Sequence, residues 1–232
     1  QTYIQTFQLL VDECIKINLI FKPEFIYADF ENAIHLGALS TWPEISIKGC
    51  RFHIAQSWWR KIQTIGLSNE YKQDSEQGKY LKYFFGLPFL KPEEVADCFI
   101  EDLMSIQPND RRIQEFTDYI LNNYIDSEAI FPPNIWADFK SSTMRTTNAC
   151  ESFHAHFNSK FYSAKPNLYQ FIEVLKTVQI DNYIKIRSGQ NKRKIILLKE
   201  NFIEEKMMEK ILGKIKRFEF VKALSFKFLP TI

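Results

Sequence analysis

The stretch that decides the fold runs from residue 25 to residue 53 and reads FIYADFENAIHLGALSTWPEISIKGCRFH. A short β-prone run over residues 25–28 leads directly into Asp29, and a helical segment over 30–40 follows. Residues 45–49 form a second predicted strand that ends in a glycine, and the chain then enters another helix. Strands that alternate with helices in this way indicate an α/β unit with parallel, buried strands.

The rest of the chain is predicted to be mostly helical, because no strand-like alternation recurs after Gly66. Residues 126–146 contain Pro132-Pro133 and a Ser/Thr cluster, which predict a loop. The predicted helices outside the segment quoted above cover residues 2–19, 52–65, 70–85, a stretch that starts at Pro92, 110–124, 147–162, 166–186 and 199–212.

Composition places the chain among soluble globular proteins. Of its 232 residues, 45% are hydrophobic and 25% are charged, so whole-chain disorder, collagen and membrane-spanning classes are excluded. No apolar run reaches the ~20 residues that span a bilayer, so we expect no membrane partner. The chain does not open with a secretory signal, and its four cysteines are far apart with no CxxC pair. These features predict reduced thiols in an intracellular protein.

Charge is distributed unevenly along the chain. From residue 185 onward there are 13 Lys and Arg against 5 Glu, a net charge of +8, whereas residues 1–184 have a net charge of −6. Such asymmetry is typical of a polyanion-binding tail. The alternative is a helix docked on the core whose lysines are only solvated. The candidate DNA-binding residues are Lys192, Arg193, Lys194, Lys214, Lys216 and Arg217.

Asp29 is the first candidate for chemistry, because it directly follows a predicted strand. In α/β folds, ligands gather outside the carboxyl ends of strands. A carboxylate at this position is suited to bind a metal ion, but Asp is also a favoured N-cap for the helix that follows. Both interpretations are open at this point.

Cys50 and His53 form a CxxH at the end of the second predicted strand. Two intervening residues allow a thiolate and an imidazole to reach one Zn²⁺ ion. Cys150 and His154 could complete such a site by residue type. The alternative is a small buried cysteine and a structurally hydrogen-bonded histidine. A third candidate is Glu151, which lies three residues before His154 and thus on one helical face with it.

Taken together, these segments resemble the transposase domain of Mutator-like elements. The resemblance rests on Asp29-Phe30-Glu31, on Gly49-Cys50-Arg51-Phe52-His53 and on the segment from Thr147 to His154, and it covers roughly residues 1–185. It implies a ribonuclease H-like fold with an all-α insertion and a DDE triad. Asp29 then matches the second catalytic Asp, Glu151 matches the catalytic Glu, and His154 is an auxiliary residue. Cys50 and His53 match a GC-x-FH segment that is structural or binds Zn²⁺.

This resemblance also implies metal-dependent chemistry on DNA. Two Mg²⁺ or Mn²⁺ ions, held by carboxylates, would activate a water or a 3′-hydroxyl and stabilise the leaving oxygen. The family's first Asp, in a DGTF segment on the first strand, has no counterpart in the 232 residues. We therefore expect the first strands to precede Gln1, and we expect this chain to be inactive alone.

The domain organisation that follows has four parts. Residues 1–66 are the second part of the ribonuclease H-like core, and 67–146 are a helical insertion and loop. Residues 147–188 are returning core helices with the catalytic-type Glu, and 189–232 are a basic helical tail.

The predicted function is therefore DNA strand cleavage and transfer by a nuclear transposase of which this chain is a part, with transposon ends and target DNA as partners. Self-association is left open by the sequence. One alternative is a domesticated, non-catalytic DNA-binding or interaction protein of the same descent. Another is a helical interaction protein with chance motifs, in which case Asp29 and Glu151 would lie far apart.

Overall fold

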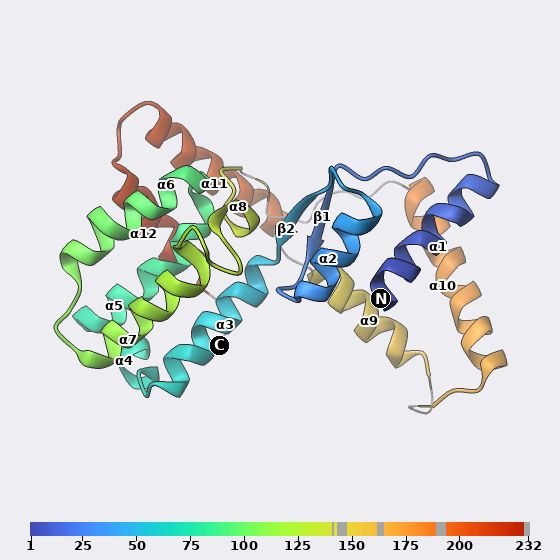
Figure 1. The fold of residues 1–232 in the computed structure, drawn as a ribbon, viewed down its shortest axis with the longest axis horizontal. Helices are drawn as coiled ribbons and strands as arrows, with labels where there is room; N and C mark the ends of the chain where they lie inside the picture. Colours follow the sequence, from blue (N-terminus) through green and yellow to red (C-terminus); the bar gives the residue numbers. More distant parts are fainter. Residues whose placement is uncertain (141, 143–147, 162–164, 189–193, 230–232) are drawn as a thin grey trace. The chain divides into compact units, whose positions relative to one another are not determined.

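The computed structural model describes residues 1–140, 142, 148–161, 165–188 and 194–229. Over these residues the chain is mostly helical, with one small sheet of two parallel strands (Figure 1). This confirms the prediction of a mostly helical α/β chain. The elements, in chain order, are α1 (Thr2–Lys16), β1 (Phe25–Ala28), α2 (Asn32–Thr41), β2 (Ser46–Gly49), α3 (Arg51–Thr64), α4 (Ser68–Lys72), α5 (Glu76–Tyr83), η1 (Phe84–Phe89), α6 (Pro92–Asp97), η2 (Cys98–Leu103), η3 (Met104–Ile106), α7 (Arg111–Ile120), η4 (Leu121–Ile125), α8 (Pro133–Trp136), α9 (Asn148–Ser159), α10 (Leu168–Ser188), α11 (Lys194–Ile211) and α12 (Arg217–Lys227).

The chain divides into two compact units. The first contains residues 1–146 and 200–232, and the second contains residues 147–199. The predicted boundary at residue 66 does not separate compact units, because α3 shares one hydrophobic core with the helices of 67–146 and with α12. Of the predicted tail over 189–232, residues 200–232 belong to the first unit and 189–199 to the second.

The sheet is supported on one side by α1 and α2. β1 and β2 run parallel in the register Phe25↔Ser46 to Ala28↔Gly49. Ile26 and Ile47, which are partners in this register, pack against a small cluster around Trp42. Two strands alone are marginally stable in water, so this apolar contact with the helices is what stabilises the pair.

Gly66 ends α3 with a Schellman motif. Its backbone has a φ of 74°, which favours glycine. The N–H of Gly66 donates to the Gln63 carbonyl at 3.0 Å, and the N–H of Leu67 donates to the Ile62 carbonyl at 2.9 Å. These bonds satisfy carbonyls that the helix end leaves without partners. The chain then turns into α4. Gly66 therefore marks the boundary between the α/β part of the chain and the helices that follow it.

The helices between residues 67 and 136 are shorter and more irregular than predicted. The expected single helix over 70–85 is two helices, α4 and α5, and the six residues of η1 that follow are 3₁₀-helical and buried. The helix from Pro92 passes into a π-helical segment, η2, and then into η3. The predicted loop over 126–146 contains the short helix α8. The buried residues of η1 and η2 belong to the main hydrophobic core.

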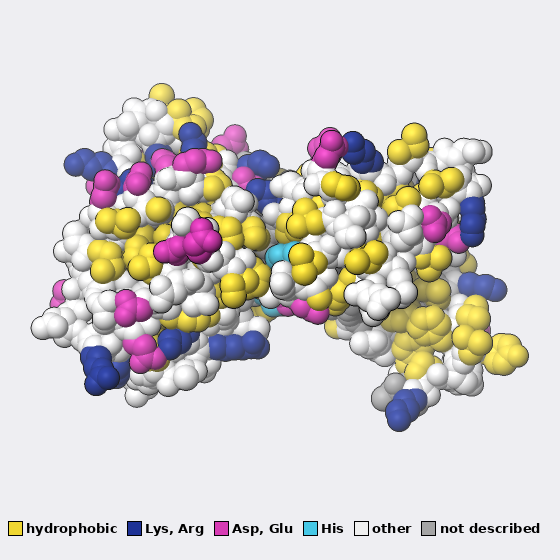
Figure 2. Space-filling view, viewed as in Figure 1, with side chains coloured by type: hydrophobic (Ala, Val, Ile, Leu, Met, Phe, Trp, Pro, Cys, Tyr) yellow, Lys and Arg dark blue, Asp and Glu magenta, His cyan; other side chains and the backbone are white. Residues whose placement is uncertain are grey.

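α12 is a helix that the sequence analysis did not predict. Its buried residues are Phe220, Val221, Leu224 and Ser225, and it packs chiefly on η1. Its charged residues, Arg217, Glu219, Lys222 and Lys227, are spread around the helix rather than gathered on one face. The 3.6-residue period that reveals an amphipathic helix is therefore weak. On the face that Figure 2 shows, acidic and basic side chains are interspersed, and no continuous basic surface is visible.

The second unit is built on α9 and α10, which are connected by aromatic contacts. Phe157 lies edge-on to Phe171 of α10, with ring centroids 5.8 Å apart, and Phe161 stacks on Phe171 at 6.2 Å. An ion pair between Lys160 Nζ and Asp181 Oδ2 at 3.2 Å links the same two segments. None of the described helices combines the length and the apolar character that crossing a lipid bilayer requires.

Candidate metal-binding site

Asp29 and Cys50 come together at the carboxyl edge of the sheet. Ala28 and Gly49 are the last pair in the register of the two strands. The residues that follow them, Asp29 and Cys50, are therefore neighbours. The N–H of Cys50 donates to the Ala28 carbonyl at 2.8 Å, which extends the ladder by one bond. Asp29 therefore occupies the position where ligands of α/β folds gather.

His53 contacts Asp29 directly. Its Nδ1 lies 3.3 Å from Asp29 Oδ1, and the side chain of Asp29 is 49% exposed. Cys50 is fully buried and precedes the first residue of α3, so His53 lies in the first turn of that helix. The prediction that the CxxH segment lies at the end of the second strand is confirmed, and the start of α3 lies beside Asp29.

The N-cap interpretation of Asp29 is wrong. α2 begins at Asn32, and the residue in the N-cap position is Glu31. Asp29 Oδ1 instead accepts a hydrogen bond of 2.7 Å from the N–H of Phe30, its own neighbour. Among the residues that the structure describes, no hydrogen bond or ion pair involves Oδ2 of Asp29. The Asp29 side chain is half-exposed, and the hard carboxylate oxygen Oδ2 fits a Mg²⁺ or Mn²⁺ ion.

Glu151 and His154 lie in α9, which is part of the second unit. Their side chains and that of Cys150 lie outside the described residues, so the predicted convergence of Glu151 with Asp29 stays a prediction. The same holds for a Zn²⁺ site that combines Cys50 and His53 with residues of α9. Within the described part of the chain, no three His, Cys, Asp or Glu side chains form a group that could hold a metal ion.

His35 is a neighbour of Asp29 that the sequence analysis missed. It is 6% exposed in α2, and its Nε2 lies 2.8 Å from the backbone carbonyl oxygen of Asp29. Its ring also contacts Phe131 edge-on, with centroids 5.9 Å apart. A single histidine one turn into a helix is not part of a recognisable metal-ligand motif. The sequence therefore contains no indication of its contact with Asp29.

Arg51, inside the CxxH segment, has a packing role. Its guanidinium lies over the rings of Phe89 and Phe228, at 5.3 and 5.7 Å from their centroids, and donates to the Phe228 carbonyl at 3.2 Å. Burial lowers the pKa of Arg51 from its ordinary value, and the neighbouring Cys50 acts in the opposite direction. This arginine therefore connects the start of α3 to the end of α12.

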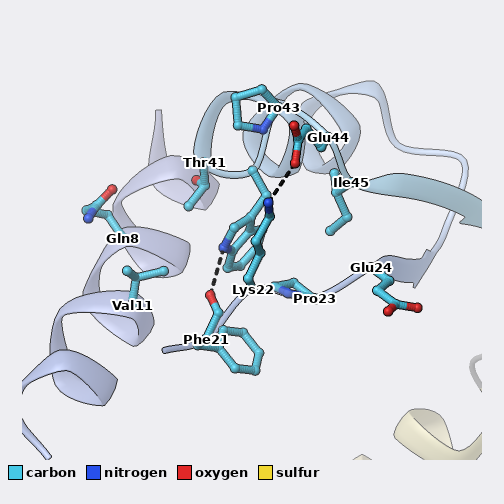
Figure 3. Close-up of a pocket in the computed structure, with 11 residues that line it drawn as sticks. Gln8, Val11, Phe21, Lys22, Pro23, Glu24, Thr41, Pro43, Glu44 and Ile45 are labelled. Atoms are coloured by element: carbon cyan, nitrogen blue, oxygen red, sulfur yellow. Dashed lines mark hydrogen bonds and ion pairs between the residues drawn. The ribbon is translucent and has the colours of Figure 1, made fainter. Parts of the chain in front are cut away.

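A cavity of about 930 Å³ lies elsewhere in the first unit, between α1 and the segments that enter the strands (Figure 3). Pro23 and Glu24 precede β1, and Ile45 precedes β2, so the cavity is at the amino ends of the strands. Lys22 Nζ and Glu44 Oε2 form an ion pair of 2.6 Å at its rim. Because Asp29 lies at the opposite ends of the same strands, this cavity is not part of the candidate site.

The candidate DNA-binding residues divide into three groups. Lys192 and Arg193 lie outside the described residues. Lys194, Lys214 and Lys216 are exposed. Arg217 requires a correction, because its guanidinium binds Asp102 Oδ2 and Glu101 Oε2, each at 2.7 Å. These contacts connect α12 to η2, so Arg217 has a structural role rather than a phosphate-binding one.

Replacing Arg217 with alanine is expected to lower the free energy of unfolding by about 1–2 kcal/mol, because charge-assisted hydrogen bonds between partly exposed groups are lost. Lys214→Ala, in the exposed segment just before α12, is the matched control and should change it by less than about 0.5 kcal/mol. Urea unfolding of both variants measures the difference. Equal stabilities of the two variants would contradict the structural role.

Known proteins offer no guide to this site, so its assignment rests on its geometry. No family model matches this chain, and no curated protein or solved structure is significantly similar to it.

Proposed function

We propose that this chain is part of a Mutator-like transposase and contains the second part of its ribonuclease H-like catalytic core, with Asp29 and Glu151 as two of its metal-binding carboxylates. The observation that carries the proposal is the contact between Asp29 and His53 at the carboxyl edge of two parallel strands. Two segments that resemble the family, separated by a helix, thus supply side chains to one place.

The residues of this chain have distinct roles in the proposed site. Asp29 offers Oδ2 to a Mg²⁺ or Mn²⁺ ion, while His53 and the Phe30 N–H hold Oδ1. Glu151 would supply a second carboxylate from α9. When bound, the metal ions would stabilise charge on the attacking and leaving oxygens of a DNA phosphodiester. Because no DGTF segment occurs in the 232 residues, we expect no DNA cleavage by this chain alone.

DNA is the proposed partner, and the proposed location is the nucleus. The exposed Lys194, Lys214 and Lys216 are proposed to neutralise phosphates, together with Lys192 and Arg193. Each phosphate contact adds about one unit to the salt dependence of binding. On this basis Lys214→Ala lowers the salt slope of duplex binding, and Arg217→Ala leaves it unchanged.

Metal-directed cleavage of the protein tests the proposed site. Fe²⁺ replaces Mg²⁺ in carboxylate sites, and with ascorbate and peroxide it cuts the backbone near its ligands. The purified chain is expected to be cut both near residue 29 and near residue 151, with both cuts lost in Asp29→Asn. Asp74→Asn is the matched control, because the Asp74 side chain is 85% exposed and lies outside the site.

Two outcomes would contradict the proposal. Cuts confined to the Asp29 segment would mean that Glu151 does not share its metal ion. Cuts that persist in Asp29→Asn would mean that the metal binds elsewhere.

The second candidate is a non-catalytic DNA-binding protein of the same descent. It is supported by the exposed Lys194, Lys214 and Lys216, which could neutralise phosphates without any metal ion. Salt-dependent duplex binding without any metal-directed cut near residue 29 or 151 would favour this candidate.

A further inference from the structure

His35 and Asp29 are linked through a backbone group rather than through their side chains. A carbonyl oxygen only accepts hydrogen bonds, so the 2.8 Å contact requires that His35 Nε2 carries the hydrogen. The carbonyl of Ala28 is already bound by the N–H of Cys50 at 2.8 Å. The carbonyl of Asp29 lies beyond the last hydrogen bond between the strands. The buried imidazole of His35 donates a hydrogen bond to this carbonyl instead.

The same peptide unit also holds the carboxylate. The carbonyl of Asp29 and the N–H of Phe30 belong to one planar group. His35 binds the carbonyl, and the N–H donates to Asp29 Oδ1 at 2.7 Å. Any rotation of this plane would move the N–H away from Oδ1, so fixing one end of the plane fixes the donor at the other.

We infer that His35 is a positioning residue for Asp29. It orients the peptide plane between Asp29 and Phe30, and that plane keeps Oδ1 facing His53 and leaves Oδ2 for a cation. Phe131, edge-on to the imidazole, keeps the ring in place. The inference rests on the proposed function where it treats the Asp29 carboxylate as a metal ligand, but the hold on the peptide plane is independent of that function.

Two substitutions separate the hydrogen bond from the packing. His35→Phe keeps a ring against Phe131 and removes the donor, whereas His35→Gln keeps an amide donor. In the full 232-residue chain, His35→Phe is expected to speed amide hydrogen exchange of Phe30 by at least about tenfold and to weaken Mn²⁺ binding by about 10–100-fold, as loss of groups that orient metal ligands typically does. His35→Gln should stay within a few-fold of the unsubstituted chain in both measurements.

The exchange measurement needs an internal reference, because His35→Phe removes a hydrogen bond of a buried side chain and so also lowers the stability of the whole unit. The Tyr71 amide, bound to the Leu67 carbonyl at 3.0 Å in α4, serves for this. If Phe30 exchange rises no more than Tyr71 exchange, the positioning role is overturned. A second result would also overturn it. In that result Asp29→Asn abolishes Mn²⁺ binding, whereas His35→Phe speeds Phe30 exchange relative to Tyr71 exchange but leaves Mn²⁺ affinity unchanged.

Failure of the proposed function gives a different result. If Asp29→Asn leaves Mn²⁺ affinity unchanged, Asp29 is not a metal ligand and the proposed function fails. The ratio of Phe30 to Tyr71 exchange in His35→Phe then still decides whether His35 holds the peptide plane.

Discussion

Trp58→Ala is expected to lower the free energy of unfolding by about 3–5 kcal/mol, the range for removing a buried Trp or Phe side chain. Trp58 is 0% exposed in α3. Its ring lies edge-on to those of Tyr124 and Trp136, each with centroids 5.7 Å apart, and contacts Phe85 at 5.8 Å. The cavity would therefore open where α3 meets η1, η4 and α8, and these segments would lose their common contact.

Trp58→Phe is the informative companion. Within the described residues, the buried Nε1 of Trp58 has no hydrogen-bond partner, and such a group costs about 1–3 kcal/mol. Phenylalanine removes that cost while it keeps an aromatic ring, so we expect a loss of less than about 1.5 kcal/mol. Urea unfolding followed by circular dichroism measures both variants. A loss below about 1 kcal/mol in Trp58→Ala would mean that this aromatic cluster is not the centre of the core.

Gly86→Ala is expected to lower the free energy of unfolding by about 3 kcal/mol, at the upper end of the usual cost of overpacking. A Cβ on Gly86, in η1, would overlap the backbone carbonyl oxygen of Val221 in α12. Backbone cannot rotate away as a flexible side chain can, so α12 must shift as a whole. The loss should appear in urea unfolding and as faster amide exchange within α12.

Gly66→Ala is the matched control for this substitution. An added Cβ at Gly66 meets nothing within 4 Å, but the residue has a positive φ of 74°. The expected loss is the cost of the left-handed conformation alone, about 1–2 kcal/mol. If Gly66→Ala is as destabilising as Gly86→Ala, close packing of α12 on η1 is not what requires glycine at residue 86.

The candidate site was only partly predictable from the sequence. Asp29, Cys50 and His53 each follow a strand by a few residues, and the rule that parallel strands end at one edge was enough to place them together. His35 could not be found in this way, because its role depends on a backbone carbonyl that is left without a ladder partner. Arg217 was misassigned for a related reason, since its acidic partners are more than a hundred residues earlier in the chain.

The sequence by itself determined the local elements of the first 66 residues, because a strand period, a helix period and a terminating glycine depend only on neighbours along the chain. β1 spans the four predicted residues, and the α3 boundaries differ from the prediction by one residue at each end. Only the tertiary structure decided the burial of η1, the packing of α12, and the contacts of His35 with Phe131 and of Arg217 with Glu101 and Asp102. The physical reason is that these features depend on contacts between residues far apart in the sequence. The charged residues of α12 are spread around the helix, so its buried face becomes evident only where η1 packs on it.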